Sequence, residues 1–497
     1  MPNSSEATFG KSSRARGSSS DRNLRLMLHP ASEISISSSY WVLACFVYSW
    51  GIYYAPSAVS RPRVAPRLIL PFLPEDRDHR FNFIIGNIQG AVFMFGVSFM
   101  DPTTVLPLFV KQFTQSDFFV GLASSLHRAG WHLPQLFIAG YVERRPKRLP
   151  VYLWANTGRM VTLGSFLPIL YFYGASHPAT VLALFITMYG CSHLFGGVAG
   201  LPFSDLVGKT IPRTHWGTFY AVRFFTGYGV MSVIAGLVIR YILASPESYP
   251  FPSNFVVIFA CGVLLMTVGY LVFGLLRERP GPVSETRRSA WMMMGEVPRI
   301  LRSDANYRRT FFTQMLAATS GLALPFYIVV ARERFEVDVS TAGIFLMTQT
   351  IGAALSNILW GWVSARFGNR RIIQGTLAVQ VVTPLYALVL TVLAPDWLRG
   401  ASDNEVLVAF LPVFFAVGST VTGSFVGFKS YLLDIAPEDR RPTYIGITST
   451  MLGVVSLFPA AGGVLVGLIT HDGVFVLTAV ALVCGLWMSS RLVRRGE

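Results

Sequence analysis

The amino-acid sequence predicts an all-α protein that crosses a membrane many times, and three observations carry this prediction. Of the 497 residues, 52% are hydrophobic and 13% are charged, whereas about a quarter of the residues of ordinary soluble domains are charged. The apolar residues gather in runs of about 20, the length that a helix needs to cross a hydrocarbon core. The Lys and Arg residues gather in alternate connections between the runs. The expected solvent is therefore lipid.

Twelve apolar runs follow one another from residue 81 onward, and we predict one membrane-spanning helix for each. Their approximate bounds are 83–110, 117–141, 149–173, 178–203, 217–243, 252–276, 309–330, 339–364, 371–394, 404–428, 442–468 and 473–490.

The distribution of basic residues predicts the orientation. Connections rich in Lys and Arg stay in the cytoplasm. The connections after the even-numbered spans, with the C-terminal tail, hold about 23 Lys and Arg. The connections after the odd-numbered spans hold Lys111, Arg332, Arg334 and Arg399. We therefore expect both termini in the cytoplasm and the chain in the cytoplasmic (inner) membrane of a cell.

The first 80 residues form an N-terminal extension of a different character. Residues 1–40 are rich in Ser and Arg without a pattern that packs, which predicts disorder. The segment 40–54 is apolar but short for a span. Three interpretations stay open for it: an interfacial or re-entrant piece, a targeting segment, or sequence upstream of the true start of translation.

The two halves of the chain share a plan. Residues 117–148 and 338–371 both begin with an acidic residue and an early glycine and end in Gly, an aromatic residue, Val and basic residues. A second correspondence joins 204–223 with 429–448, which both pass from a helix end through a proline into a new span. We therefore predict two six-helix bundles, 81–276 and 309–497, joined by a basic cytoplasmic linker at 277–308 that carries a short amphipathic helix.

With twelve spans, a basic linker and a Gly-plus-basic signature after spans 2 and 8, the chain resembles the major facilitator superfamily over about residues 81–490. In that family the loop signature takes part in gating. Here it includes Gly140, Glu143, Arg145, Arg148, Gly361, Arg366, Gly368, Arg370 and Arg371.

The resemblance also implies an aspartate in this signature that latches the cytoplasmic side closed. Ala365 stands at its place in the second copy, and Arg144 in the first, with Glu143 one position earlier. The latch is therefore in question, and Glu143 is the candidate to replace it in the first half. The competing interpretation is that these arginines only fix the orientation of the helix ends and take no part in gating.

Four ionisable residues lie within the predicted spans, where each charge needs a partner or water. They are Asp101, Arg128, Arg159 and Arg223, and His127, His132 and His193 accompany them in the same half. The resemblance implies that Asp101, Arg128, His193 and Arg223 reach a central cavity, with Arg159 in support. Ion pairs within the first bundle are the structural alternative.

Three arginines against one aspartate leave an excess of positive charge, which favours an anionic ligand. We expect a small organic anion or carboxylate-bearing solute, held by Arg128 with or without Arg223, because guanidinium groups suit carboxylates. Asp101 or a histidine is the candidate to carry a coupling proton. The predicted activity is secondary active transport by alternating access.

Other functions fit the sequence less well. A net charge of +15 suits nucleic-acid binding only on a soluble domain, and none is evident. The four cysteines form no metal-binding or disulfide pattern, and no cofactor or catalytic motif is present, so we expect neither a metal site nor an enzyme. Multidrug or amphiphile efflux, and a non-transporting membrane receptor or scaffold, stay as alternatives. We expect a monomer.

Overall fold

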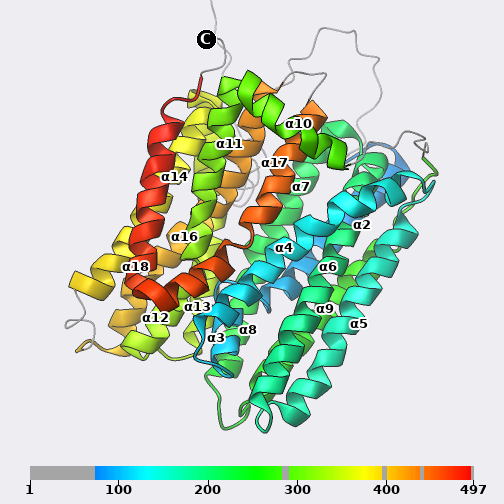
Figure 1. Cartoon of the computed structure of the whole chain (residues 1–497). Coiled ribbons are helices and arrows are strands. Elements are labelled where there is room, and N and C mark those ends of the chain that lie inside the picture. Colours follow the sequence, from blue (N-terminus) through cyan, green and yellow to red (C-terminus); the bar gives the residue numbers. More distant parts are fainter. Residues whose placement is uncertain (1–72, 282–289, 394–399, 437–440, 494–497) are drawn as a thin grey trace, which may run out of the picture. The chain divides into compact units, whose positions relative to one another are not determined.

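The computed structural model describes residues 73–281, 290–393, 400–436 and 441–493. Within these residues the chain is helical and contains no β-strand (Figure 1). The predicted disorder of residues 1–40 and the apolar segment 40–54 lie outside the described residues. The predicted linker is described except for residues 282–289, and its amphipathic helix is present as α10.

The helices of the first half follow the predicted spans closely. In chain order they are α2 (Arg77–Ser98), α3 (Val105–Lys111), α4 (Asp117–Glu143), α5 (Leu149–Tyr173), α6 (Pro178–Thr210), the 3-10 turn η1 (Arg213–His215), α7 (Trp216–Phe224), the π-helical η2 (Phe225–Met231), α8 (Ser232–Leu243) and α9 (Ser253–Phe273).

The helices of the second half begin with the linker helix. They are α10 (Ala290–Ser303), α11 (Ala305–Ala318), the 3-10 turn η3 (Thr319–Leu322), α12 (Phe326–Phe335), α13 (Thr341–Phe367), α14 (Asn369–Leu388), the π-helical η4 (Val389–Leu393), α16 (Asp403–Ile435), α17 (Arg441–Val455) and α18 (Phe458–Ser489).

Nine helical stretches within the described residues are long and apolar enough to cross a membrane. α4 and α5 occupy two further predicted spans with 27 and 25 residues, but they are not among the nine. The last candidate, Ile447–Ser489, has non-helical backbone at Thr470 and thus covers two predicted spans. The protein is therefore an all-helical, multi-pass membrane protein with about nine candidate spans, and the count of twelve stays a prediction.

The predicted first span, 83–110, differs most from the structure. Its helix begins earlier, at Arg77, and is interrupted between Ser98 and Val105. Pro102 lies in the interruption and lacks a backbone N–H donor. Asp101 lies there too, and its main-chain oxygen accepts hydrogen bonds from the N–H groups of Val105 and Leu106. The interruption places a carboxylate beside the start of α3.

Aromatic packing holds the short helix α3 in the first half. Phe109 is fully buried and contacts rings of α5, α6 and α9. Its ring centroid lies 6.3 Å from Phe166, 4.8 Å from Phe185, and 5.1 and 4.8 Å from Phe255 and Phe259. Such contacts stabilise by about 0.5–1.5 kcal/mol for each pair beyond simple burial. The packing of α3 thus fixes the position of the preceding segment, which carries Asp101.

The two copies of the duplicated segment make equivalent close contacts. In the first half, a side chain on Gly197 of α6 would overlap the main-chain oxygen of Gly130 of α4. In the second half, a side chain on Gly418 of α16 would overlap the main-chain oxygen of Gln349 of α13, and one on Gly352 that of Phe415. Small residues let membrane helices approach backbone to backbone. Both helix pairs are therefore closely packed at glycine.

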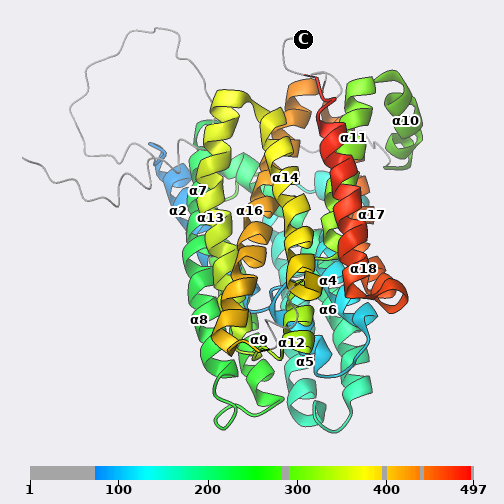
Figure 2. The same cartoon turned by 90° about the vertical axis from the view of Figure 1, so that its left-hand side faces the viewer.

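Glycines also bring the first half against the second. A side chain on Gly121 of α4 would overlap the main-chain oxygen of Pro459 of α18, and one on Gly463 that of Asp117. Likewise, α8 lies alongside α13 in Figure 2, where a side chain on Gly343 would overlap the main-chain oxygen of Gly236. These contacts lie toward one end of the helices, which also holds Lys111 and is called the Lys111 end below. The other, where α5 begins, is the Arg148 end.

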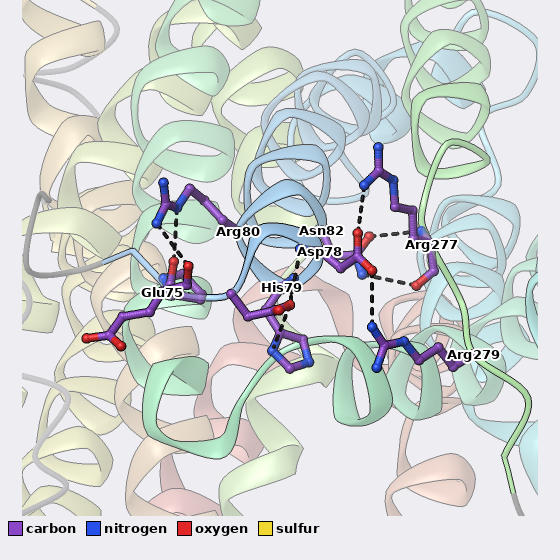
Figure 3. A network of polar contacts seen from close by, with 9 residues as sticks. Glu75, Asp78, His79, Arg80, Asn82, Arg277 and Arg279 are labelled. Carbon is purple, nitrogen blue, oxygen red and sulfur yellow. Dashed lines mark hydrogen bonds and ion pairs between the residues drawn. The ribbon is translucent and has the colours of Figure 1, made fainter.

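A polar network at the Arg148 end fastens the first helix of the described chain to the segment after α9 (Figure 3). The carboxylate of Asp78 accepts hydrogen bonds from Arg277 at 2.6 Å and Arg279 at 3.2 Å. The side chain of Asn82 pairs with the main chain of Arg277 in both directions, at 2.8 and 3.1 Å. Asp76 caps α2 by accepting from the N–H of Asp78. The first and last helices of the first half are thus held together.

The glycine packing gives a stability prediction. We expect Gly418→Ala to lower the melting temperature in detergent, because the added methyl meets backbone that cannot move aside, and overpacking costs about 1–3 kcal/mol. Gly467→Ala is the matched control, since nothing lies within 4 Å of its added methyl. The measurement is thermal unfolding followed by tryptophan fluorescence. Equal melting temperatures for the two variants would contradict the packing described for α13 and α16.

Candidate functional site

Asp101 is the centre of a polar chain that reaches from the first half to the second. Its Oδ1 atom accepts hydrogen bonds from the N–H and hydroxyl groups of Thr103 and of Thr104, at 2.6–2.9 Å. The Thr103 hydroxyl also lies 2.8 Å from Oε1 of Gln349 on α13. One hydroxyl proton serves only one acceptor, so the Gln349 amide turned over, with its NH2 donating, satisfies both contacts. A carboxylate, a hydroxyl and an amide thus form one continuous chain.

Arg128 lies on the face of α4 that is turned toward α17 and α18. Before it, Ser125 accepts a hydrogen bond through Oγ from the N–H of Ala460 on α18 at 2.9 Å. One turn after it, the Cβ of His132 lies 3.5 Å from the point that a methyl on Gly453 of α17 would occupy. Residues three and four apart share a helix face. Arg128 therefore falls between two contacts with the second half.

The Arg128 guanidinium has no direct partner. The side chain is exposed although it belongs to the middle of the 27-residue α4. It makes no hydrogen bond or ion pair with any residue in the described part of the chain. Asp101 attracts it through space without touching it. All five N–H donors of this arginine are thus available to a ligand.

His127 and His193 form a hydrogen-bonded pair between α4 and α6. His127 Nδ1 lies 3.1 Å from His193 Nε2, and His193 Nδ1 lies 2.9 Å from the main-chain oxygen of Tyr189. A carbonyl oxygen only accepts, so His193 Nδ1 carries a proton and donates it. In the neutral ring, His193 Nε2 then accepts the proton of His127 Nδ1. The nitrogen of the pair that is left to take up a further proton is His127 Nε2.

Arg159 of α5 is buried beside this histidine pair. It is 5% exposed, and its Nε atom has no hydrogen-bond partner within the described residues. Its guanidinium lies 5.4 Å from the ring centroid of Phe93. A cavity of about 10 Å³ is lined by Arg159, His127, His193 and apolar side chains, which is room for a single water molecule. Arg159 is placed to influence the histidine pair.

Arg223 is buried between α7 and α2, and its guanidinium group is hydrogen-bonded to α2. Its Nη1 atom donates to the main-chain oxygen of Gly86 at 2.7 Å and to Oε1 of Gln89 at 2.6 Å. The guanidinium also lies 4.7 Å from the ring centroid of Phe203. A side chain on Gly90 would overlap Arg223. The structure thus places this predicted ligand-binding arginine within a helix contact.

At the Arg148 end, acids outside the loop signature hold the first copy of the loop. Arg148 is 5% exposed and pairs through Nε with Asp205 of α6 at 3.0 Å. Glu278 accepts the main-chain N–H groups of Arg148 and Leu149 at 2.7–2.9 Å, which caps the start of α5. Lys209 bridges Asp205 and Glu278 at 3.0 and 3.6 Å. The side chain of Glu143, the predicted substitute, lies outside the described residues.

The second copy of the loop is held in a comparable way. Asn369 at the start of α14 accepts from the Ser364 hydroxyl and donates to Asp434 of α16 at 2.7 Å. Between them Gly368 ends α13 with φ = 82°, a backbone conformation that glycine adopts without strain. In both halves, the start of the helix after the loop therefore contacts an acid on a neighbouring long helix.

A charge cluster at the Lys111 end joins the two halves. Lys111 pairs with Asp117 at 2.9 Å and with Glu333 of α12 at 2.6 Å. Asp117 also lies 3.5 Å from Nε2 of His471, next to the break in α18. With Ser125–Ala460 and Thr103–Gln349, these contacts between the halves lie from the middle of the helices to the Lys111 end.

The sequence-predicted residues therefore fall into separate places. Asp101 and Arg128 lie near the contact between the halves, His193 lies behind them with His127, and Arg223 lies in the α2–α7 contact. Sequence reasoning missed Asp205, Glu278, Asp434 and the Lys111 cluster. In the sequence, the only pattern that indicated these contacts was an acidic residue near a helix end, and many surface positions have the same pattern. No group of three or more potential metal ligands occurs within the described residues.

The comparisons with known proteins agree with the fold. The family model of the Major Facilitator Superfamily matches residues 310–497. Among solved structures, the nucleoside transporter NupG superposes with a TM-score of 0.61 at 14% identity, over 83% of this chain and 100% of that chain. A bacterial homologue of the iron transporter ferroportin, in an outward-facing state, superposes with a TM-score of 0.54 at 13% identity, over 84% and 99%. At such identities the likeness concerns the fold.

The curated relatives that match the chain do not indicate an activity for it. Uncharacterized proteins of Mycobacterium tuberculosis and Mycobacterium bovis are 23% identical over 293 residues, which is 57% of this chain and 53% of theirs. The chain thus spans about half the length of the curated relatives it matches. The family model, which matches residues 310–497, and the fold agree with the resemblance found in the loop signatures and the duplicated span plan.

Proposed function

We propose that the protein is a secondary active transporter that moves a small organic anion or carboxylate-bearing solute by alternating access. The observation that carries the proposal is Arg128, an arginine in the middle of a long helix, without a partner in the described chain, at the contact between the halves. Secondary transporters bind solutes near the membrane midplane between their repeats. The position of Arg128 in the middle of α4, at the contact between the halves, supports such a site.

The balance of charge supports an anion. Asp101, the nearby acid, is already occupied by four hydrogen bonds from Thr103 and Thr104. Arg159 and Arg223 add two more buried positive charges in the same half. A guanidinium in a poorly hydrated place is stabilised by a carboxylate, which it binds through two parallel hydrogen bonds. A solute carboxylate at Arg128 therefore reduces an excess of positive charge.

The topology that we propose has twelve spans in the cytoplasmic (inner) membrane, with bundles at 81–276 and 309–497 and the linker 277–308 on the cytoplasmic side. The basic residues of the Arg148 end support this orientation, because basic loops face the cytoplasm. The Lys111 end is then the outer end. Since the contacts between the halves gather there, we assign the structure to the outward-closed state of the transport cycle.

We further propose that protons are the coupling ion and that the His127–His193 pair carries them. His127 Nε2 is the remaining basic nitrogen of the pair, and Arg159 and Arg128 are the positive charges that act on it. A solute anion that neutralises Arg128 removes part of this repulsion and makes protonation of the pair easier. Binding of the anion and uptake of the proton then favour each other, as coupling requires.

The anion proposal predicts the effect of removing the charge at Arg128. In proteoliposomes tested with radiolabelled mono- and dicarboxylates, we expect Arg128→Gln to reduce uptake at least tenfold, because a hydrogen bond to a charged group contributes about 1.5–3 kcal/mol. Arg302→Gln is the control, since Arg302 is an exposed arginine of the linker helix α10, outside the loop signatures. Uptake limited to neutral or cationic solutes, or equal anion uptake by both variants, would refute the proposal.

The coupling proposal predicts a separable defect for His127→Asn. We expect this variant to exchange labelled for unlabelled anion across the membrane but to lose accumulation driven by an inward proton gradient, because asparagine cannot take up the proton. His177→Asn, at the exposed start of α6 beside Ser176, serves as control. Gradient-driven accumulation at the wild-type level in His127→Asn would show that the pair does not carry the proton.

A further inference from the structure

A crevice between α14 and α18 lies away from the proposed solute site. It has a volume of about 730 Å³ and lies at the Arg148 end. Its wall is apolar and includes Ala378 of α14 and Val483, Leu486 and Trp487 of α18. Val483 and Trp487 are 49% and 57% exposed, so the crevice opens to the outside of the helices. In a membrane this surface faces lipid.

One arginine lines the end of the crevice, and two more contact residues that line it. Arg371 lines it, is exposed, and donates to the Gln374 side chain at 3.0 Å, which leaves most of its donors available. The guanidinium of Arg491 lies over the Trp487 ring, 3.7 Å from its centroid. Arg370 is fixed nearby by its hydrogen bond to the main-chain oxygen of Ser490 at 2.7 Å. Three positive charges therefore meet beside an apolar wall.

The backbone strengthens this positive field. Arg370 and Arg371 belong to the first turn of the 20-residue α14, where the N–H groups of a helix carry a partial positive charge and favour anions. The residues that line the crevice include no acid among those described. A phosphate group at this position is therefore attracted by side chains and by the helix end together.

We propose that this crevice binds one anionic phospholipid, with its phosphate between Arg371 and Arg491 and an acyl chain along the wall formed by Ala378, Val483 and Leu486. The arginines of the crevice lie at the helix ends, and its apolar wall extends toward the helix middles. A phospholipid has its charged headgroup and its acyl chains in the same order. Basic pockets between membrane helices bind anionic headgroups in this manner. A free phosphate ion fits the arginines but leaves the apolar wall uncovered.

The test is native mass spectrometry of the purified full chain with phosphatidylglycerol or phosphatidylcholine. We expect phosphatidylglycerol to bind more tightly, and Arg371→Gln with Arg491→Gln to weaken it about fivefold for each arginine removed. Ala378→Phe narrows the crevice without changing charge and should weaken binding too. Arg145→Gln is the matched control, because it removes an exposed arginine from the corresponding loop of the first half.

The remaining outcomes also decide the proposal. A large excess of inorganic phosphate should displace the lipid only partly, because phosphate does not fill the apolar wall. Complete displacement by phosphate, equal retention of both lipids, or unchanged binding in the double variant and in Ala378→Phe would each overturn it. Melting curves of each variant confirm that the fold is intact, and the single arginine variants replace the double variant if it does not fold.

Discussion

The rest of the structure depends on two places where helices from the two halves touch backbone to backbone. Gly121 and Gly463 let α4 and α18 touch without side chains between them, and Gly236 and Gly343 do the same for α8 and α13. Only glycine leaves space for such contact, and in lipid close van der Waals packing is a main source of helix association. These contacts hold the Lys111 end together, and the ion pairs of Lys111 with Asp117 and Glu333 lie beside the contact between α4 and α18.

The same packing explains why one arginine differs from the others. Where helices are in close contact, buried guanidinium groups meet main-chain oxygens or aromatic rings, as Arg223 does at Gly86 and Phe203. Arg128 follows Ser125 on the same face of α4, nearer the middle of the helix than the glycine contact with α18. Its charge is therefore left for water or a solute. Separation of the halves would widen this place further.

Much of this organisation can be predicted from the sequence, because apolar runs, basic loops and duplicated glycines are local patterns. The helices lie near the predicted spans, and the duplicated segments make equivalent contacts at Gly130 and Gly352. The partners of charged residues could not be predicted. Asp205 of α6 and Glu278, in the segment after α9, lie 57 and 130 positions after Arg148 in the chain. Such pairs depend on helix rotation and depth, which hydrophobic patterns do not determine.

The central claim is that closure at the Lys111 end alternates with closure at the Arg148 end. Spin-label distances measured in proteoliposomes test it directly, with labels at Gln115 and Glu336 for one end and at Lys147 and Arg366 for the other, after replacement of the native cysteines. We predict that Gly463→Leu, which prevents contact with Asp117, lengthens the first distance and shortens the second, while Gly467→Leu changes neither. Identical distance distributions in the two variants would contradict the account.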